Sequence, residues 1–178
     1  MYANGRGVPQ DGAEAVRWFR LAAEQGILVA QANLGLMYTL GVGVPQDAAE
    51  GVRWYRLAAE RGNAPAQYNL GLIYALGAGV PQDDAEAVRW TRLAVEQGHA
   101  DGLYNLGKMY GDGRGVPQDY VQAHMWYNLA ASRRTGEDEE REKAVEARDR
   151  IANQLTPDDL SDAQRLAREW DAAHPREP

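Results

Sequence analysis

Few side chains in this sequence are of the kinds that build a catalytic or metal site. The three histidines, His99, His124 and His174, are scattered, and the chain contains no cysteine. A transition-metal site needs three or four such ligands brought close together, so we predict no metal ion. No nucleophile stands in a pattern that pairs it with a base, so we predict no catalytic residue, no cofactor and no enzymatic activity.

The Gly-x-Gly segments are another feature with chemical potential, because glycine-rich loops can hold phosphate. Gly41-Val42-Gly43 is one of four related copies, and the others begin at Gly5, Gly77 and Gly113. A dinucleotide-binding loop follows a β-strand and carries a third glycine, and neither is present here. Four copies in phase indicate turns between helices.

The side chains best suited to binding form a ladder with a spacing of 36 residues, at Asn33, Asn69 and Asn105. An asparagine amide both donates and accepts hydrogen bonds, so a ladder of them could hold a peptide backbone in register. The alternative is that these amides bond neighbouring helices, and the sequence favours neither.

Positions beside this ladder change character along the chain. At a spacing of 36 residues, Leu36 and Leu72 are followed by Lys108. At the same spacing, Leu40 and Leu76 are followed by Asp112. The surface is therefore predicted to be apolar toward the N-terminus and polar toward the C-terminus, and exposed apolar patches usually mark partner sites. We expect the tyrosines to serve as anchors. The predicted partner-binding residues are Asn33, Asn69, Asn105, Leu36, Leu72, Tyr68, Tyr104 and Lys108.

These positions imply a repeat array. The tryptophans recur every 36 residues, at Trp18, Trp54, Trp90 and Trp126. A fixed period of this length indicates stacked units that bury a continuous core. Small residues flank each indole, so we expect all four rings to fill the gaps between units.

Each repeat is predicted to contain two helices. In the second repeat, residues 29–40 carry apolar side chains at helical spacing, and Gly-Val-Gly-Val-Pro ends the helix. The next helix begins at Asp47, an N-cap residue with Glu50 at the third position, as Asp11, Asp83 and Asp119 do in the other repeats. Gly26, Gly62 and Gly98 are expected to end these second helices in the left-handed conformation. Glu–Arg pairs, such as Glu50–Arg53 and Arg56–Glu60, suit a solvated face better than an anion-binding track.

The two ends of the array differ. Two helices off the repeat pattern, one ending near Leu155 and one starting at Pro157 after Thr156, are predicted to cap the C-terminal end. Helix 11–25 lacks such a partner, and Met1-Tyr2 has the phase of Met37-Tyr38, which suggests a fragment whose first repeat is truncated. We therefore predict an all-α solenoid, with repeats over residues 1–132 and a two-helix cap and tail over residues 133–178.

The totals exclude several function classes. The net charge of −7 and the pI near 5.0 disfavour nucleic acid, which requires a basic face. No apolar run reaches the ~18–20 residues that a membrane span needs, so membrane insertion is not expected.

Three phrases resemble the Sel-1-like repeat family, a group of tetratricopeptide-like arrays. They are AQYNLGLIY at 66–74, GAGVPQD at 77–83 and AVRWTRLA at 87–94. The resemblance implies a right-handed superhelix of helix pairs and a scaffold or adaptor role in protein complexes, with the first helix of each pair on the concave side. It also implies that the protein is bacterial and favours an exported or periplasmic location. Some cysteine-rich relatives are labelled β-lactamases, and that activity is not carried over to a chain without cysteine.

Three functional hypotheses follow. The first is a scaffold that binds a protein or peptide segment on the concave surface. The second is a structural homo-oligomer that associates through residues 11–29, where Ile27-Leu28-Val29 extends the apolar surface. The third is a hydrolase of the β-lactamase type, for which we expect no turnover of nitrocefin.

Overall fold

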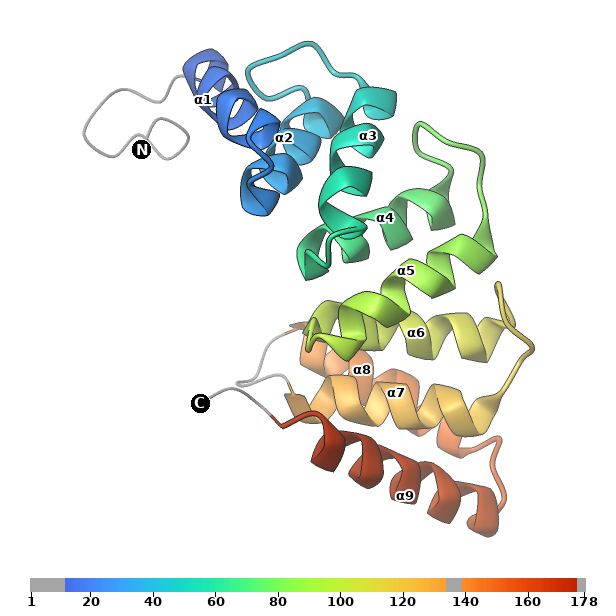
Figure 1. Cartoon of the computed structure of the whole chain (residues 1–178). Helices are drawn as coiled ribbons and strands as arrows, with labels where there is room; N and C mark the ends of the chain where they lie inside the picture. Colours follow the sequence, from blue (N-terminus) through green and yellow to red (C-terminus); the bar gives the residue numbers. More distant parts are fainter. Residues whose placement is uncertain (1–11, 134–138, 176–178) are drawn as a thin grey trace. The chain divides into compact units, whose positions relative to one another are not determined.

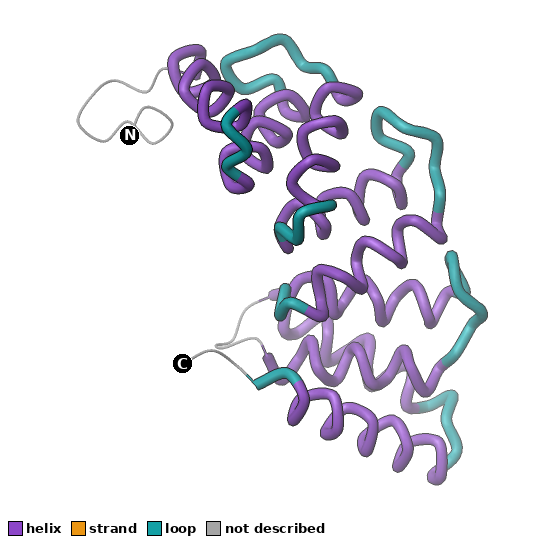
Figure 2. Tube along the Cα trace, in the orientation of Figure 1, coloured by secondary structure: helices purple, strands orange, loops and turns teal. Residues whose placement is uncertain are grey.

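The computed structural model describes residues 12–133 and 139–175, and every regular element within them is a helix (Figures 1 and 2). None of these helices is long and apolar enough to span a membrane. The described part forms two compact units, one ending at Asp83 and one starting at Asp84. Unit 1 holds α1 (Gly12–Glu24), α2 (Leu28–Leu40), α3 (Ala48–Ala59) and α4 (Ala64–Leu76), and unit 2 holds α5 (Asp84–Glu96), α6 (Ala100–Asp112), α7 (Tyr120–Arg133), α8 (Glu139–Ala152) and α9 (Pro157–Ala173).

The helix pairs follow the predicted order. We call α2, α4 and α6 the A helices and α1, α3, α5 and α7 the B helices, since each repeat runs A then B. Within unit 1, α2 packs against both α1 and α3, and α3 packs against α4; within unit 2, α7 packs against α6, α8 and α9. In unit 1, α3 therefore buries two faces, one against each of the two A helices.

Capping residues fix where the helices begin and end. The Asp47 carboxylate accepts a hydrogen bond from the Glu50 backbone N–H at 3.0 Å, and Asp119 accepts one from Gln122 at 2.9 Å. Gly41 ends α2 with φ of +72°, a left-handed conformation that glycine adopts without strain. The predicted caps are thus confirmed at Asp47 and Asp119, while that at Asp11 lies outside the described residues.

Glycine allows the A and B helices to approach closely. A Cβ atom on Gly35 of α2 would lie 2.9 Å from the Tyr55 ring of α3, and one on Gly107 of α6 would lie 2.8 Å from the Tyr127 ring of α7. Both tyrosines are buried. At these two positions, an A-helix glycine therefore packs against the tyrosine ring that follows the repeat tryptophan on the B helix.

The prediction for the tryptophans is correct at three positions and wrong at the fourth. Trp54, Trp90 and Trp126 are buried, but Trp18 is 49% exposed. Trp54 packs among α1 and α2 residues such as Val16, because two helices precede it. No described helix precedes α1, so within the described residues that face of α1 has no helix to cover Trp18.

Two C-terminal helices follow the repeats as the sequence indicated, although α8 ends at Ala152 rather than near Leu155. Thr156 caps α9 in a full capping box with Asp159. The Trp170 ring of α9 lies edge-on to Trp126 of α7, with ring centroids 5.6 Å apart. Arg133 at the end of α7 lies over the Trp170 ring at 4.6 Å and pairs with Asp171 at 2.8 Å. In unit 2, α9 therefore covers the apolar side of α7 (Figure 1).

Candidate partner-binding surface

The A helices of unit 1 expose an unusual surface. Neither α2 (LVAQANLGLMYTL) nor α4 (APAQYNLGLIYAL) contains a charged residue. Their outward positions are nonetheless in contact with solvent, with Leu40 61% exposed and Leu76 76% exposed, and Val29 and Leu36 are exposed as well. Leaving large apolar side chains in water forfeits the free energy of their burial, about 1.5–3 kcal/mol for a leucine. Helices of this kind usually meet a partner.

The predicted binding residues all lie at least partly at the surface. Leu36 and Lys108 are exposed, and the others are half-buried: Asn33, Asn69, Asn105, Leu72, Tyr68 and Tyr104. The predicted binding residues are divided between the two units. Unit 1 carries the apolar members, whereas α6 of unit 2 carries Lys108 and Asp112 in the phases of Leu36 and Leu40.

Two of the helix-to-helix hydrogen bonds come from glutamines that the sequence analysis did not single out. The amide nitrogen of Gln31 in α2 donates to the Ala23 carbonyl of α1 at 3.1 Å, and that of Gln67 in α4 donates to the Ala59 carbonyl of α3 at 3.0 Å. Both glutamines are buried. They recur at the repeat period, which was the available signal, but the third copy is Leu103 and so the series is short.

One arginine of each of α1, α3 and α5 also makes a structural hydrogen bond. Arg56 donates to the Tyr74 hydroxyl at 2.5 Å and Arg92 to that of Tyr110 at 2.6 Å, and Arg20 donates to Tyr38 in the same way. Within the described residues, the predicted pair Arg56–Glu60 does not form, and neither do its copies at Arg20 and Arg92. Each guanidinium instead joins a B helix to the A helix that follows it.

In α1, α3 and α5, a second arginine lies beside the repeat tryptophan and pairs with a glutamate of the same helix. Glu50 accepts from Arg53 at 2.6 Å and from the Trp54 indole N–H at 2.8 Å, and the Arg53 guanidinium lies 4.5 Å from the Trp54 ring centroid. The hydrogen bond from Arg53 lowers the pKa of Glu50 below its usual value. The Glu–Arg pair is therefore confirmed, and its arginine is not available as part of an anion track.

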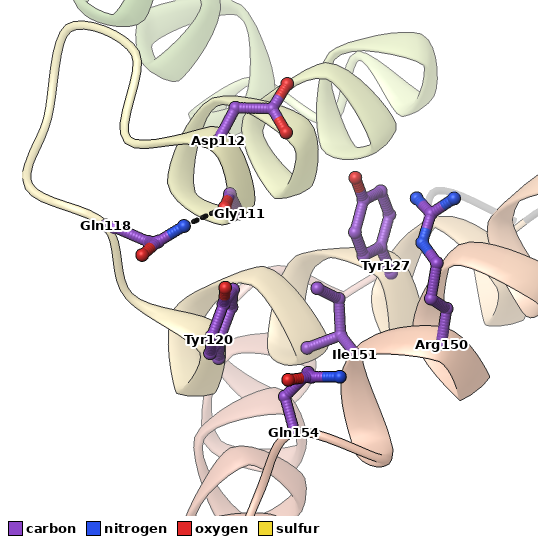
Figure 3. Close-up of a pocket in the computed structure, with 8 residues that line it drawn as sticks. All are labelled: Gly111, Asp112, Gln118, Tyr120, Tyr127, Arg150, Ile151 and Gln154. Atoms are coloured by element: carbon purple, nitrogen blue, oxygen red, sulfur yellow. Dashed lines mark hydrogen bonds between the residues drawn. The ribbon is translucent and has the colours of Figure 1, made fainter.

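A pocket of about 670 Å³ opens in unit 2 between the end of α6, the start of α7 and α8 (Figure 3). The Tyr127 hydroxyl points into it, with Asp112 on one side and Arg150 on the other. Gln118 forms part of the wall and donates to the Gly111 carbonyl at 2.8 Å. Tyr120, Ile151 and Gln154 complete the lining.

The groups in this pocket are suited to hydrogen bonding. Burial raises the pKa of Tyr127 to about 12, with Tyr104 and Asp112 adding to the shift, so the phenol is neutral and can donate or accept. The Tyr104 ring packs against the Tyr127 ring with centroids 5.3 Å apart. The predicted anchor Tyr104 therefore adjoins the pocket, and Lys108 lies one helical turn from both Tyr104 and Asp112.

The histidines occupy three separate environments. His99 is the N-cap residue of α6, and burial lowers its pKa. His124 is buried in α7, and burial together with the nearby Arg148 lowers its pKa. His174 stacks on Trp170 at 4.1 Å. In the described ranges, no group of three or more histidine, aspartate or glutamate side chains could hold a metal ion.

The repeat boundaries agree with those of a known family. The Sel1 repeat model matches residues 1–27, 28–63, 64–99 and 100–134. The chain belongs to the Sel1 repeat family. Each match from residue 28 onward begins at an A helix and extends through the following B helix. A search of the curated proteins gave no match.

Two solved structures show the same Sel1 repeat fold. A protective antigen present in uropathogenic Escherichia coli strains, which displays an SLR fold, is 35% identical, with a TM-score of 0.84 over 96% of this chain and 36% of its own. A Sel1 repeat protein from Oxalobacter formigenes is 37% identical, with a TM-score of 0.71 over 74% of this chain and 52% of its own. The chain thus spans between a third and about half of the length of these two Sel1 proteins.

The family assignment confirms the predicted solenoid of helical hairpins. Sel1 repeat proteins generally act as protein-interaction scaffolds, and the repeat is generally a non-catalytic fold.

Proposed function

We propose that this Sel1 repeat chain binds a protein or peptide segment on the outward face of its A helices. The observation that carries the proposal is the uncharged, solvent-exposed face of α2 and α4, with Leu36, Leu40 and Leu76 exposed. In unit 2, Tyr104, Asn105 and Lys108 supply the polar counterpart beside the pocket at Tyr127. A segment with apolar side chains and an accessible backbone fits this chemistry.

The test uses substitutions that the protein itself tolerates at equivalent positions. Leu36→Lys with Leu40→Asp copies the Lys108 and Asp112 of α6 onto α2, so the variant should fold. Peptides are selected on the wild-type protein from a random displayed library, and their affinity is measured by fluorescence anisotropy. We expect the double variant to weaken binding at least ~10-fold, because two apolar contacts are worth more than ~1.4 kcal/mol.

Leu57→Lys is the matched control, because Leu57 is an exposed apolar residue on the B helix α3. It should bind the selected peptides as the wild type does. Asn69→Ala with Tyr104→Ala tests the ladder and the anchor, and should also weaken binding while helical content stays constant. Equal binding by all of these variants would remove the A helices as the binding surface.

A second candidate function is self-association. Trp18, Leu21 and Ile27 are exposed on α1 and the turn that follows it, and a second copy of the chain could cover them. Light scattering across concentration separates this function from peptide binding.

A further inference from the structure

Unit 2 contains a second cavity, on another side of α8 from the pocket at Tyr127. It has a volume of about 420 Å³ and lies among α7, α8 and α9. Each helix contributes side chains spaced by one turn. The lining comprises His124 and Asn128 of α7, Arg148, Asp149 and Ala152 of α8, and Leu160, Gln164 and Arg168 of α9. A volume of this size is in the range of small-molecule sites.

Some polar side chains that line this cavity have no ion-pair or hydrogen-bond partner within the described residues. Arg148 is paired with Asp149 at 2.7 Å, so its charge is neutralised. Arg168 has no ion pair within the described residues. Its neighbour Arg165, which is not among the lining residues, is paired with both Asp162 and Glu169 at 3.0 Å. Arg168, a solvent-exposed residue of α9, is therefore the arginine of the lining that forms no ion pair within the described residues.

Amide and imidazole groups accompany this cation. The side chains of Asn128 and Gln164 make no hydrogen bond within the part of the chain that the structure describes. His124 is only 4% exposed, and its Nδ1 atom has no partner there either. Buried polar atoms are nearly always paired, since leaving one unpaired costs about 1–3 kcal/mol. The imidazole forms part of the cavity wall, so its ring signals should respond to a group bound there.

We infer that this cavity binds a small organic carboxylate. A guanidinium with a neighbouring amide N–H is a common arrangement for holding carboxylate oxygens, and Arg168 and Gln164 provide it one turn apart on α9. Leu160 and Ala152 offer apolar contact for a short carbon chain. Asp149 limits the net positive charge, which suits a monoanion better than a phosphate. The inference does not depend on the surface of the A helices.

The experiment follows the imidazole signals of the whole 178-residue chain by proton–carbon NMR. The three histidines give three signals, which single substitutions assign. The protein is titrated with sodium butyrate, with neutral butyramide, with the tripeptide Ala-Leu-Leu and with its C-terminal amide. We expect a saturable shift of the His124 signal with a carboxylate at millimolar concentration and no such shift with butyramide or the peptide amide.

The two carboxylates distinguish the source of the ligand. Saturation by butyrate assigns the cavity to free acids, whereas saturation by the tripeptide alone assigns it to a chain terminus. No saturable shift with either carboxylate, or an equal shift with butyramide, would overturn the inference.

Arg168→Gln should weaken carboxylate binding ~10-fold or more, as expected for loss of a charged hydrogen bond, and Gln164→Met should weaken it less. Arg165→Gln, on the same helix but outside the cavity, is the control and should bind as the wild type does. Identical affinities for the Arg168 and Arg165 variants would also contradict the proposed site. The Leu36→Lys, Leu40→Asp variant should lose peptide binding but bind carboxylate as the wild type does. The two proposals can therefore be tested independently of each other.

Discussion

At the scale of single residues, glycine shows how strongly the helix contacts constrain this sequence. Gly107 and Gly111 lie one turn apart on α6. A Cβ on Gly107 would stand 2.8 Å from the Tyr127 ring, whereas one on Gly111 would have ordinary contacts of 3.6 Å and longer. Only the first glycine is required by packing.

The same substitution should therefore have opposite effects at these two positions. We expect Gly107→Ala to lower the free energy of unfolding by ~1–3 kcal/mol, because the buried ring must move. Gly111→Ala should raise it by up to ~1 kcal/mol, because alanine favours the helix. Urea denaturation followed by circular dichroism measures both. A stabilising Gly107→Ala would show that α6 and α7 are less tightly packed than described.

His124 gives the stability a dependence on pH. Its neighbours Arg148 and Asp149 lie on α8, Arg168 lies on α9, and burial is the largest cause of its lowered pKa. Above the unfolded pKa of about 6.5 both states are neutral and the histidine contributes nothing. As the pH falls from there toward the lower folded pKa, the unfolded chain binds a proton first, so stability is lost.

His124→Gln should remove this component. We expect the wild type to lose stability relative to the variant between pH 7.5 and 5.5, by no more than ~1.4 kcal/mol per pH unit. Urea unfolding at each pH measures the difference, and His99, whose pKa is also lowered, is common to both proteins and cancels. Parallel stability curves would mean that His124 is protonated equally in the two states.

At the scale of the elements, the N-caps of the A helices differ although their backbones agree. The N-cap residues Ile27, Asn63 and His99 share extended dihedral angles, but only Asn63 accepts a side-chain hydrogen bond, from the Ala66 N–H at 2.9 Å. Helix α2 thus begins without the side-chain cap that α4 has.

Exchange of these caps should shift stability by similar amounts in opposite directions. We expect Asn63→Ala to cost ~1 kcal/mol and Ile27→Asn to add ~1 kcal/mol, because each changes one N-cap bond. Thermal and urea unfolding of the two variants provide the measurement. If Ile27→Asn were destabilising, the exposed isoleucine would have to be making contacts that the described residues do not show.

The junction of α7 and α9 depends on one cation. The Arg133 side chain is 8% exposed, pairs with Asp171, lies over Trp170 and donates to the His174 carbonyl. Arg133→Met should lower stability by ~1–3 kcal/mol and increase hydrogen exchange in α9 more than elsewhere. Arg165→Met removes only exposed ion pairs of the same helix and should cost less than ~1 kcal/mol. Equal effects would show that α9 is held by its apolar contacts alone.

At the scale of the whole molecule, periodicity predicted the fold well. Helical patterns, N-cap residues and helix-ending glycines recur together in each repeat, so the evidence from one repeat strengthens the prediction for the others. The exposure of Trp18 departed from the pattern because a period assigns each copy the same neighbours, whereas α1 has no described helix before it. The hydrogen bonds that Gln67 and Tyr74 make to neighbouring helices were not predicted. Their donors and acceptors lie on different helices, and the repeat period does not show which face of one helix packs against the next. The cavity at His124 and Arg168 was missed for the same reason, because its residues come from three helices and two of these, α8 and α9, lie outside the repeat pattern.

The distribution of exposed apolar side chains leads to the last prediction. In the described part of the chain, every large hydrophobic residue that is exposed precedes Asp84, and Trp18 and Leu21 stand one turn apart on α1. If a second copy covers this face, multi-angle light scattering should give a mass that rises above 19.6 kDa with concentration.

Trp18→Lys with Leu21→Lys should return the protein to the monomer mass at every concentration, whereas Leu57→Lys on α3 should associate as the wild type does. A constant monomer mass for the wild type would discard self-association. The exposed faces of α1, α2 and α4 would then be left to partners other than this chain.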